Sequence, residues 1–183
     1  MRRFGAATAV ACLGVTLAGC IDSTAPILTD SRPLLGERLD LRLYTLRDGK
    51  ISNDGEGAIF VWNGQAYANI VKSLSDVAYF SVHPFDDGNF IVQTYPLDHA
   101  RGNEYALMRP TGLVKEAYVL AAIDEEDADT ATRKANCDTS NTHACRVSTR
   151  DQLFALARAT AAHPHPYGAL VVNVGARPEP DKK

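Results

Sequence analysis

Histidine and cysteine side chains in the second half of the chain are the first candidates for chemistry. His163 and His165 are separated by a single proline, and His143 lies two residues before Cys145. Imidazole is the commonest protein ligand for zinc or copper, so the His-Pro-His spacing is compatible with a metal-binding loop. A helix that ends before His163 and Pro164 explains the same residues, because proline cannot donate the helical hydrogen bond. We therefore predict no metal site and no cofactor.

Cys137 and Cys145 allow two interpretations. In an exported protein two such cysteines form a disulfide, and the polar segment DTSNTHA between them would then be a stapled surface loop. The alternative makes Cys145 a nucleophile with His143 as its base. No third residue that would orient these two side chains is evident. We predict the disulfide.

Acidic residues cluster in the segment IDEEDADT, residues 123–130. Carboxylate oxygens are the ligands that calcium prefers. The segment lacks the turn glycine and the distant bidentate glutamate of an EF-hand loop. A solvated acidic loop is the simpler interpretation.

Sequence signatures of enzymes are missing. The chain has no GxSxG, HExxH, Walker-type or GxGxxG motif. A pair of carboxylates brought together by folding would leave no such signature. The sequence predicts no catalytic residues and gives no ground for assigning an enzymatic activity. A hydrolase or an inhibitor that acts on the cell wall or on proteases stays as a further alternative.

The amino-terminal segment also ends on a reactive residue. Arg2 and Arg3 precede an uncharged apolar stretch that finishes in the tetrapeptide LAGC, residues 17–20. A basic end, an apolar stretch and small residues before a cleavage point are the three parts of a secretory signal peptide. The stretch is shorter than the roughly 20 apolar residues of a membrane-spanning helix.

The tetrapeptide LAGC resembles the lipobox of bacterial lipoproteins. The resemblance implies that the Cys20 thiol is joined to diacylglycerol, that a signal peptidase cuts between Gly19 and Cys20, and that acyl chains such as palmitate hold the protein on the membrane. Two or more chains give lasting attachment. In this class an aspartate directly after the cysteine favours the inner membrane, and here that position is Ile21. The resemblance thus implies the periplasmic face of the outer membrane, with the inner membrane as the alternative.

The charge of the mature chain excludes one class of partner. Removal of residues 1–19 takes away Arg2 and Arg3, which leaves 17 basic and 22 acidic side chains and a net charge of −5. Phosphate contacts need clustered lysine and arginine, and the chain has no such cluster. Nucleic acid is therefore not a predicted partner.

The segments that must position these residues form one domain in our interpretation. After the signal peptide (1–19), residues 20–33 are rich in small, polar and proline residues and predict a flexible tether. Residues 34–175 have the length of a single β-rich domain. Residues 176–183 carry two prolines and several charges and predict a disordered tail.

Alternating apolar residues predict that the domain is mainly β. Leu39, Leu41 and Leu43 alternate with polar positions, as in a strand with one wet face. Hairpin turns are expected at Asn63-Gly64 as a type I′ turn, at residues 86–88, and at residues 110–112. Tyr105, Leu107 and Val119 are predicted to point inward. Either an antiparallel meander sheet or a small barrel satisfies this pattern.

One C-terminal helix is predicted to pack on this sheet. Thr149 and Gln152 have the spacing of a capping box, and the buried face is expected to hold Leu153, Leu156, Ala157 and Thr160. A last strand follows in YGALVVNV. The strand pair, the two cysteines and this helix loosely resemble the C-terminal layout of small uncharacterised proteobacterial lipoproteins. That resemblance implies no activity.

The sequence predicts the function of the protein only in outline. We predict a non-catalytic binding or structural module on the cell envelope, anchored to the membrane by lipid, with an envelope protein or the cell wall as partner. The alternative is a β-barrel carrier of a small molecule or lipid. Aromatic residues on the expected strands would either pack the sheet, which we favour, or line a ligand cavity; they are Trp62, Tyr67, Tyr79, Phe80, Tyr95, Tyr105 and Tyr118.

Overall fold

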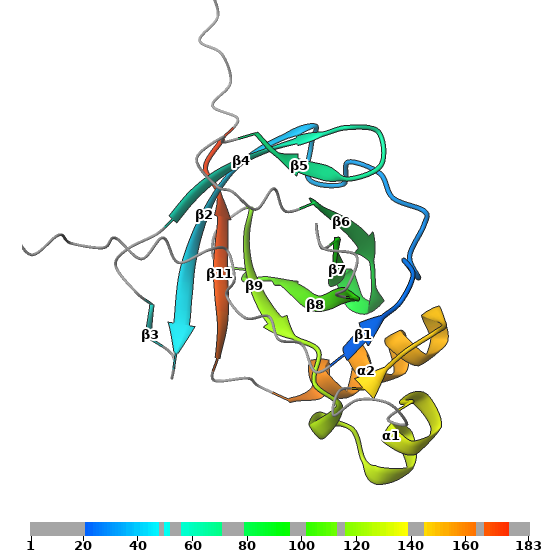
Figure 1. The fold of residues 1–183 in the computed structure, drawn as a ribbon. Coiled ribbons are helices and arrows are strands. Elements are labelled where there is room, and N and C mark those ends of the chain that lie inside the picture. Colours follow the sequence, from blue (N-terminus) through cyan, green and yellow to red (C-terminus); the bar gives the residue numbers. More distant parts are fainter. Residues whose placement is uncertain are drawn as a thin grey trace, which may run out of the picture.

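A ring of antiparallel strands dominates the structure, a computed structural model (Figure 1). It describes residues 21–47, 50–51, 56–70, 79–95, 102–112, 116–138, 145–163 and 167–175. The predicted signal peptide, Cys20 and the predicted tail lie outside these residues.

Within the described residues, eight strands form a closed barrel. They are β2 (Arg38–Arg47), β4 (Glu56–Trp62), β5 (Tyr67–Asn69), β6 (Tyr79–Pro84), β7 (Phe90–Tyr95), β8 (Asn103–Pro110), β9 (Ala117–Ala122) and β11 (Tyr167–Asn173). Each strand from β4 to β9 pairs with the next in this series, so most of the wall is the predicted meander.

The last strand closes the barrel. β11 inserts between β9 and β2, and it pairs with β2 over seven residues, from Tyr167 opposite Arg47 to Asn173 opposite Leu41. Closure gives the backbone groups of β2 and β9 a partner, which an open sheet would leave at exposed edges. Of the two predicted architectures, the barrel is the correct one.

Three short strands of the described chain lie outside this ring. β3 (Lys50–Ile51) pairs antiparallel with the end of β2. β1 (Ile21–Ser23) pairs antiparallel with the start of β8 and parallel with β10 (Cys145–Arg146). Gly102 lets β1 approach closely, because a Cβ there would stand 2.8 Å from the carbonyl oxygen of Ser23.

The prediction of a flexible tether over residues 20–33 is wrong for residues 21–33. Ile21 and Leu28 have relative exposures of 0% and 1%, and both belong to a hydrophobic core. The composition suggested a tether because serine, threonine and proline separate these few apolar anchors. The folded domain therefore begins at residue 21 of the described chain.

The barrel interior holds the first hydrophobic core. Leu39, predicted to face inward, packs there. The buried members are Leu39, Ala58, Phe60, Tyr67, Val82, Val92, Ala106 and Met108. Tyr67 also anchors the chain before β2, since its hydroxyl accepts from the N–H of Leu35 and donates to the carbonyl of Gly36 at 2.8 Å.

A second core lies between the outer wall of the barrel and the helices. Figure 1 shows β1, α1 (Thr130–Asn136) and α2 (Arg150–Ala162) together on one outer side of the ring. The buried members are Ile21, Leu28, Ile91, Tyr105, Leu107, Ile123, Cys145, Val147, Leu153, Leu156 and Ala157. Tyr105 and Leu107 are therefore buried, but on the outer face of β8 and not inside the barrel.

The sequence predicts one of the two described α-helices correctly and misses the other. Thr149 and Gln152 form the predicted capping box, and α2 buries the four residues expected of it. The helix α1 was not predicted. It begins after the acidic run, where Asp129 accepts a hydrogen bond from the N–H of Thr132, while Glu125–Asp127 form the short 3-10 helix η2.

The predicted hairpins are present, with one correction to turn geometry. The turn between β4 and β5 contains Gly64 at φ 99°, but Asn63 does not take the positive φ of a type I′ turn. Its side chain instead accepts from the N–H groups of Gln65 and Ala66, which closes a longer loop. The β6–β7 turn is the 3-10 helix η1 (Asp86–Gly88), with Asp87 at φ 55°.

Candidate functional site

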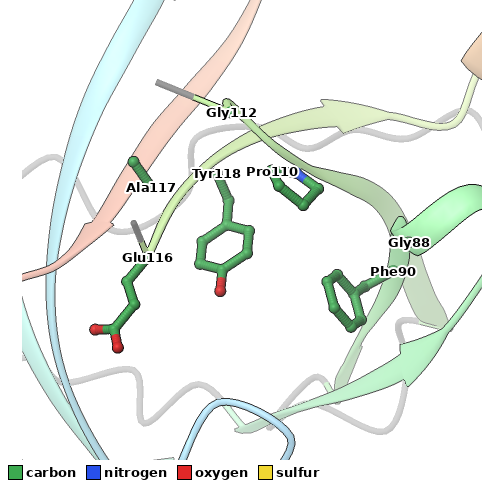
Figure 2. A pocket seen from close by; sticks show the side chains of 7 residues that line it. All are labelled: Gly88, Phe90, Pro110, Gly112, Glu116, Ala117 and Tyr118. Atoms are coloured by element: carbon green, nitrogen blue, oxygen red, sulfur yellow. The ribbon is translucent and has the colours of Figure 1, made fainter. Parts of the chain in front are cut away.

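A hollow of about 470 Å³ opens at one mouth of the barrel. Figure 2 shows Phe90 from β7 and Tyr118 from β9 projecting into it. Its lining comprises Gly88, Phe90, Pro110, Gly112, Glu116, Ala117 and Tyr118. A volume of this size is within the range of small-molecule sites in proteins.

The β8–β9 connection positions one side of the hollow. Thr111 donates to the carbonyl of Ala117 at 2.9 Å, and the carbonyl of Glu116 accepts from the N–H of Asn173 on β11 at 3.0 Å. Glu116 takes φ 62°, an uncommon value for a residue other than glycine. These backbone contacts hold the Glu116 carboxylate at the rim, where the side chain is exposed.

The floor of the hollow continues into the barrel core. Phe90 and Tyr118 pack edge to face with ring centroids 6.3 Å apart, and both contact the first hydrophobic core, in the barrel interior. Burial raises the pKa of the Tyr118 phenol, and the Glu116 carboxylate raises it further. The phenol is therefore a neutral hydrogen-bond donor near physiological pH.

This lining can bind but offers little for catalysis. Two aromatic rings and a proline supply apolar contact, while one phenol and one carboxylate can fix a polar group. Among the described lining residues, no nucleophile stands beside a base. The hollow has the composition expected for an apolar or amphipathic small molecule.

The predicted aromatic residues divide between the two faces of the wall. Tyr67 stacks on Phe80 inside the barrel, with ring centroids 5.1 Å apart, and Trp62 packs edge to face on Tyr67. Tyr105 is buried on the outer face. Most of these rings pack the structure, as predicted, and one of the seven, Tyr118, lines the hollow.

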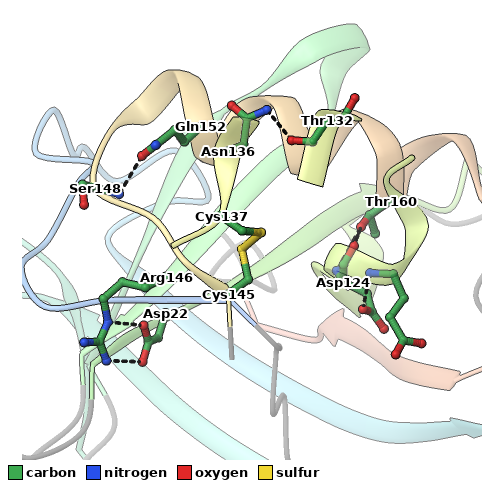
Figure 3. Close-up of a disulfide and its surroundings, with 11 residues drawn as sticks. Asp22, Asp124, Thr132, Asn136, Cys137, Cys145, Arg146, Ser148, Gln152 and Thr160 are labelled. Carbon is green, nitrogen blue, oxygen red and sulfur yellow. Dashed lines mark hydrogen bonds and ion pairs between the residues drawn. A yellow bond between two sulfur atoms is a disulfide. The ribbon is translucent and has the colours of Figure 1, made fainter. Parts of the chain in front are cut away.

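The predicted disulfide is present. Cys137 and Cys145 are bonded, and Figure 3 shows the bond beside the paired side chains of Asp22 and Arg146. Arg146 donates to both carboxylate oxygens of Asp22, at 2.9 and 3.1 Å. The disulfide therefore lies where β1 and β10 meet, at the edge of the outer core.

The other residues considered for chemistry do not assemble into a site. His163 is the residue that follows α2 and is exposed, while His143 and His165 lie outside the described residues. In the acidic run, Asp124 and Asp129 accept backbone hydrogen bonds from Glu126 and Thr132. In the part of the chain that the structure describes, no three histidine, cysteine, aspartate or glutamate side chains are grouped for a metal ion.

A buried polar network on the outer wall was missed by the sequence analysis. Ser81, His83 and Gln93 are each completely buried. The Ser81 hydroxyl contacts Nε2 of His83 at 2.7 Å and the hydroxyl of Tyr95 at 2.9 Å. Alternate polar residues on both strands of one predicted hairpin were the available signal, since Ser81 pairs directly with Gln93.

Comparison with known proteins adds no family to these observations. No protein-family model, no curated protein and no solved structure matches the chain. Within the described ranges, neither helix combines the length and hydropathy needed to cross a membrane.

Proposed function

We propose that this protein is a non-catalytic, lipid-anchored binding protein of the cell envelope whose barrel takes up a small apolar or amphipathic molecule at its mouth. The hollow that Phe90 and Tyr118 line is the observation that carries the proposal. Closed antiparallel barrels of this strand number are suited to enclosing one small ligand. This favours the carrier over a module that only contacts a protein or the wall.

The anchor rests on the sequence LAGC and the acylation of Cys20 that it implies. Because Ile21 is already part of β1, a lipid on Cys20 would join the folded domain without a flexible spacer. The barrel would then stand directly on the periplasmic face of the membrane. We propose the outer membrane because the residue after Cys20 is Ile21 and not an aspartate.

Ligand uptake is tested with N-phenyl-1-naphthylamine, an uncharged dye that fluoresces in apolar sites. The wild-type protein should bind the dye saturably. Tyr118→Arg places a charge in the hollow and should weaken binding roughly tenfold or more, as for a buried unpaired polar group. The matched control is Tyr44→Arg. Tyr44 is a partly exposed tyrosine of β2, and it occupies one of the positions that alternate with the inward-facing Leu39. Equal binding by both variants, or none by the wild type, would contradict the carrier.

The anchor needs a separate measurement. Intact mass spectrometry of the protein from its native membranes should give a chain that starts at Cys20 and carries acyl chains. The Cys20→Ala variant should be recovered without lipid. An unmodified Cys20 in the native protein would overturn the anchor and leave the ligand site as a separate question.

A further inference from the structure

The polar network on the outer barrel wall holds the segment of residues 24–33, which we term the strap. Gln93 on β7 makes the central contacts. Its side-chain oxygen accepts from the N–H groups of Ile27 and Leu28 at 3.2 and 3.1 Å. Its nitrogen donates to the carbonyl of Leu28 at 3.2 Å and to the hydroxyl of Tyr95 at 2.7 Å. These bonds fix the orientation of the amide group.

The orientation of Gln93 determines the direction of the remaining hydrogen bonds. Tyr95 accepts from Gln93, so its own hydroxyl is left to donate to Ser81. Ser81 in turn donates to Nε2 of His83. We assign the hydrogens in this way because each hydroxyl then donates to one partner and accepts from another, which leaves His83 a neutral imidazole with its proton on Nδ1, the nitrogen nearer to Asp30.

The second nitrogen of His83 faces the strap. Nδ1 lies 3.6 Å from Oδ1 of Asp30, beyond hydrogen-bond distance, and it has no hydrogen-bond partner among the described residues. Asp30 is 65% exposed and also lies 3.7 Å from Arg150 at the start of α2. Among the described residues, the charged and titratable groups around His83 are thus Asp30 on the strap, Arg150 on α2 and Tyr95 on β7.

We propose that His83 is the pH-sensitive element of a latch: the neutral imidazole completes the network that holds the strap on the barrel wall, and protonation of the imidazole releases the strap. The inference concerns the opposite side of the wall from the hollow and does not depend on the proposed ligand.

Protonation conflicts with the network in two ways. A proton on Nε2 meets the hydroxyl hydrogen of Ser81, so Ser81 must turn and donate to Tyr95, and the hydroxyl hydrogen of Tyr95 then loses Ser81 as its acceptor. The positive charge is also buried, at a position with a relative exposure of 0%. Burial lowers the pKa of His83, and Arg150 lowers it too, while the Asp30 carboxylate acts in the opposite direction without cancelling the shift.

The sign of the pH dependence follows from this lowered pKa. With the strap released, His83 regains the ordinary imidazole pKa of about 6.5. The released state therefore binds more protons than the attached state below that pH. Attachment is strongest at neutral pH, weakens as the pH falls below about 6.5, and stops weakening below the pKa of the attached state.

Amide hydrogen exchange tests the latch in the full protein. The N–H groups of Ile27 and Leu28 should exchange faster at pH 5.5 than at pH 7.5 after correction for intrinsic rates. The increase should be at most about tenfold per pH unit below pH 6.5, as for one proton. Amides of β2 and β11 serve as the internal reference and should change little.

Two variants separate the latch from a general loss of stability. His83→Gln cannot be protonated and should abolish the pH dependence of exchange in the strap. Asp30→Asn removes the group that raises the pKa of His83 in the attached state. In this variant, amide exchange in the strap should therefore go on accelerating to a lower pH than in the wild type. Equal acceleration in His83→Gln and the wild type would overturn the proposal. If His83→Gln does not fold, NMR titration of wild-type His83 decides the question, because a pKa at or above 6.5 contradicts the latch.

Discussion

Thr160 on α2 accepts a hydrogen bond from the backbone N–H of Asp124, with 3.0 Å between Oγ1 and the nitrogen. The hydroxyl in turn donates to the carbonyl of the same residue at 3.4 Å. Thr160 is completely buried, and its partner precedes the 3-10 helix η2 (Figure 3). One side chain therefore ties α2 to the chain that leaves β9.

Replacement of this hydroxyl should destabilise the protein. Thr160→Val keeps the shape of the side chain and removes both hydrogen bonds, so we expect the free energy of unfolding to fall by about 1–2 kcal/mol. Urea denaturation followed by circular dichroism measures the change. The same substitution at exposed Thr24 should stay within about 0.5 kcal/mol of the wild type. Equal stability of the two variants would show that the Thr160 bonds contribute nothing.

Loss of Gln93 should loosen the strap at every pH. Gln93→Leu leaves the N–H groups of Ile27 and Leu28 without their acceptor, at a cost of roughly 2–4 kcal/mol if both remain buried. Exchange of both amides should then be fast at pH 7.5 as well as at pH 5.5. Gln65→Leu is the matched control because Gln65 is exposed. Protected amides in Gln93→Leu would mean that the strap is held by its apolar contacts alone.

Reduction of the disulfide should lower stability by a moderate amount. Cys137 and Cys145 are eight residues apart, and chain-entropy arithmetic for so short a loop gives roughly 2–3 kcal/mol. The midpoint of urea unfolding should fall when a reductant is added to the wild type. A variant with both Cys137→Ala and Cys145→Ala should have the lower midpoint already and should not respond to reductant. A response in that variant would show that the reductant acts elsewhere.

The capping box of α2 should make a smaller contribution to the free energy of unfolding. In Thr149→Ala the N–H of Gln152 loses its acceptor, and we expect a loss of about 1 kcal/mol in unfolding free energy. Ser148→Ala is the control, because it is the backbone N–H of Ser148 that bonds to Gln152. If the two alanine variants unfold alike, the Thr149 side chain is not stabilising the helix.

Features encoded by neighbouring residues were the ones that the sequence predicted well. The Thr149 and Gln152 pair and the buried face of α2 need only helical spacing. All three predicted hairpin turns carry a glycine at positive φ, namely Gly64, Gly88 and Gly112. Alternation also placed Leu39 correctly, because one face of β2 is partly exposed.

Features that depend on distant pairing could not be predicted in the same way. Both faces of β8 are buried, since Ala106 packs inside the barrel and Tyr105 packs under the helices. Alternation therefore could not tell which face was the interior. The strap was misassigned because its attachment depends on Gln93, which is 65 residues away from Leu28 in the sequence. Nothing near this polar residue indicated that its side chain is buried.

The candidate site was predicted only in part for the same reason. Tyr118 was named among possible lining residues, but Phe90 and Glu116 were not. They meet Tyr118 only because β7, β8 and β9 are neighbours in a closed wall. The wall itself depends on β11, whose position between β9 and β2 leaves no local pattern in the sequence.

The pairing of β2 with β11 has a consequence for the kinetics of folding. Asp40 and Asn173, which are joined by a hydrogen bond, are 133 residues apart. Contacts of such sequence separation form slowly, because the loop between them must lose its conformational entropy first. Until β11 arrives, β2 and β9 each present an unpaired edge to other chains. The interval between synthesis of β2 and docking of β11 is therefore the period in which this protein is most exposed to aggregation.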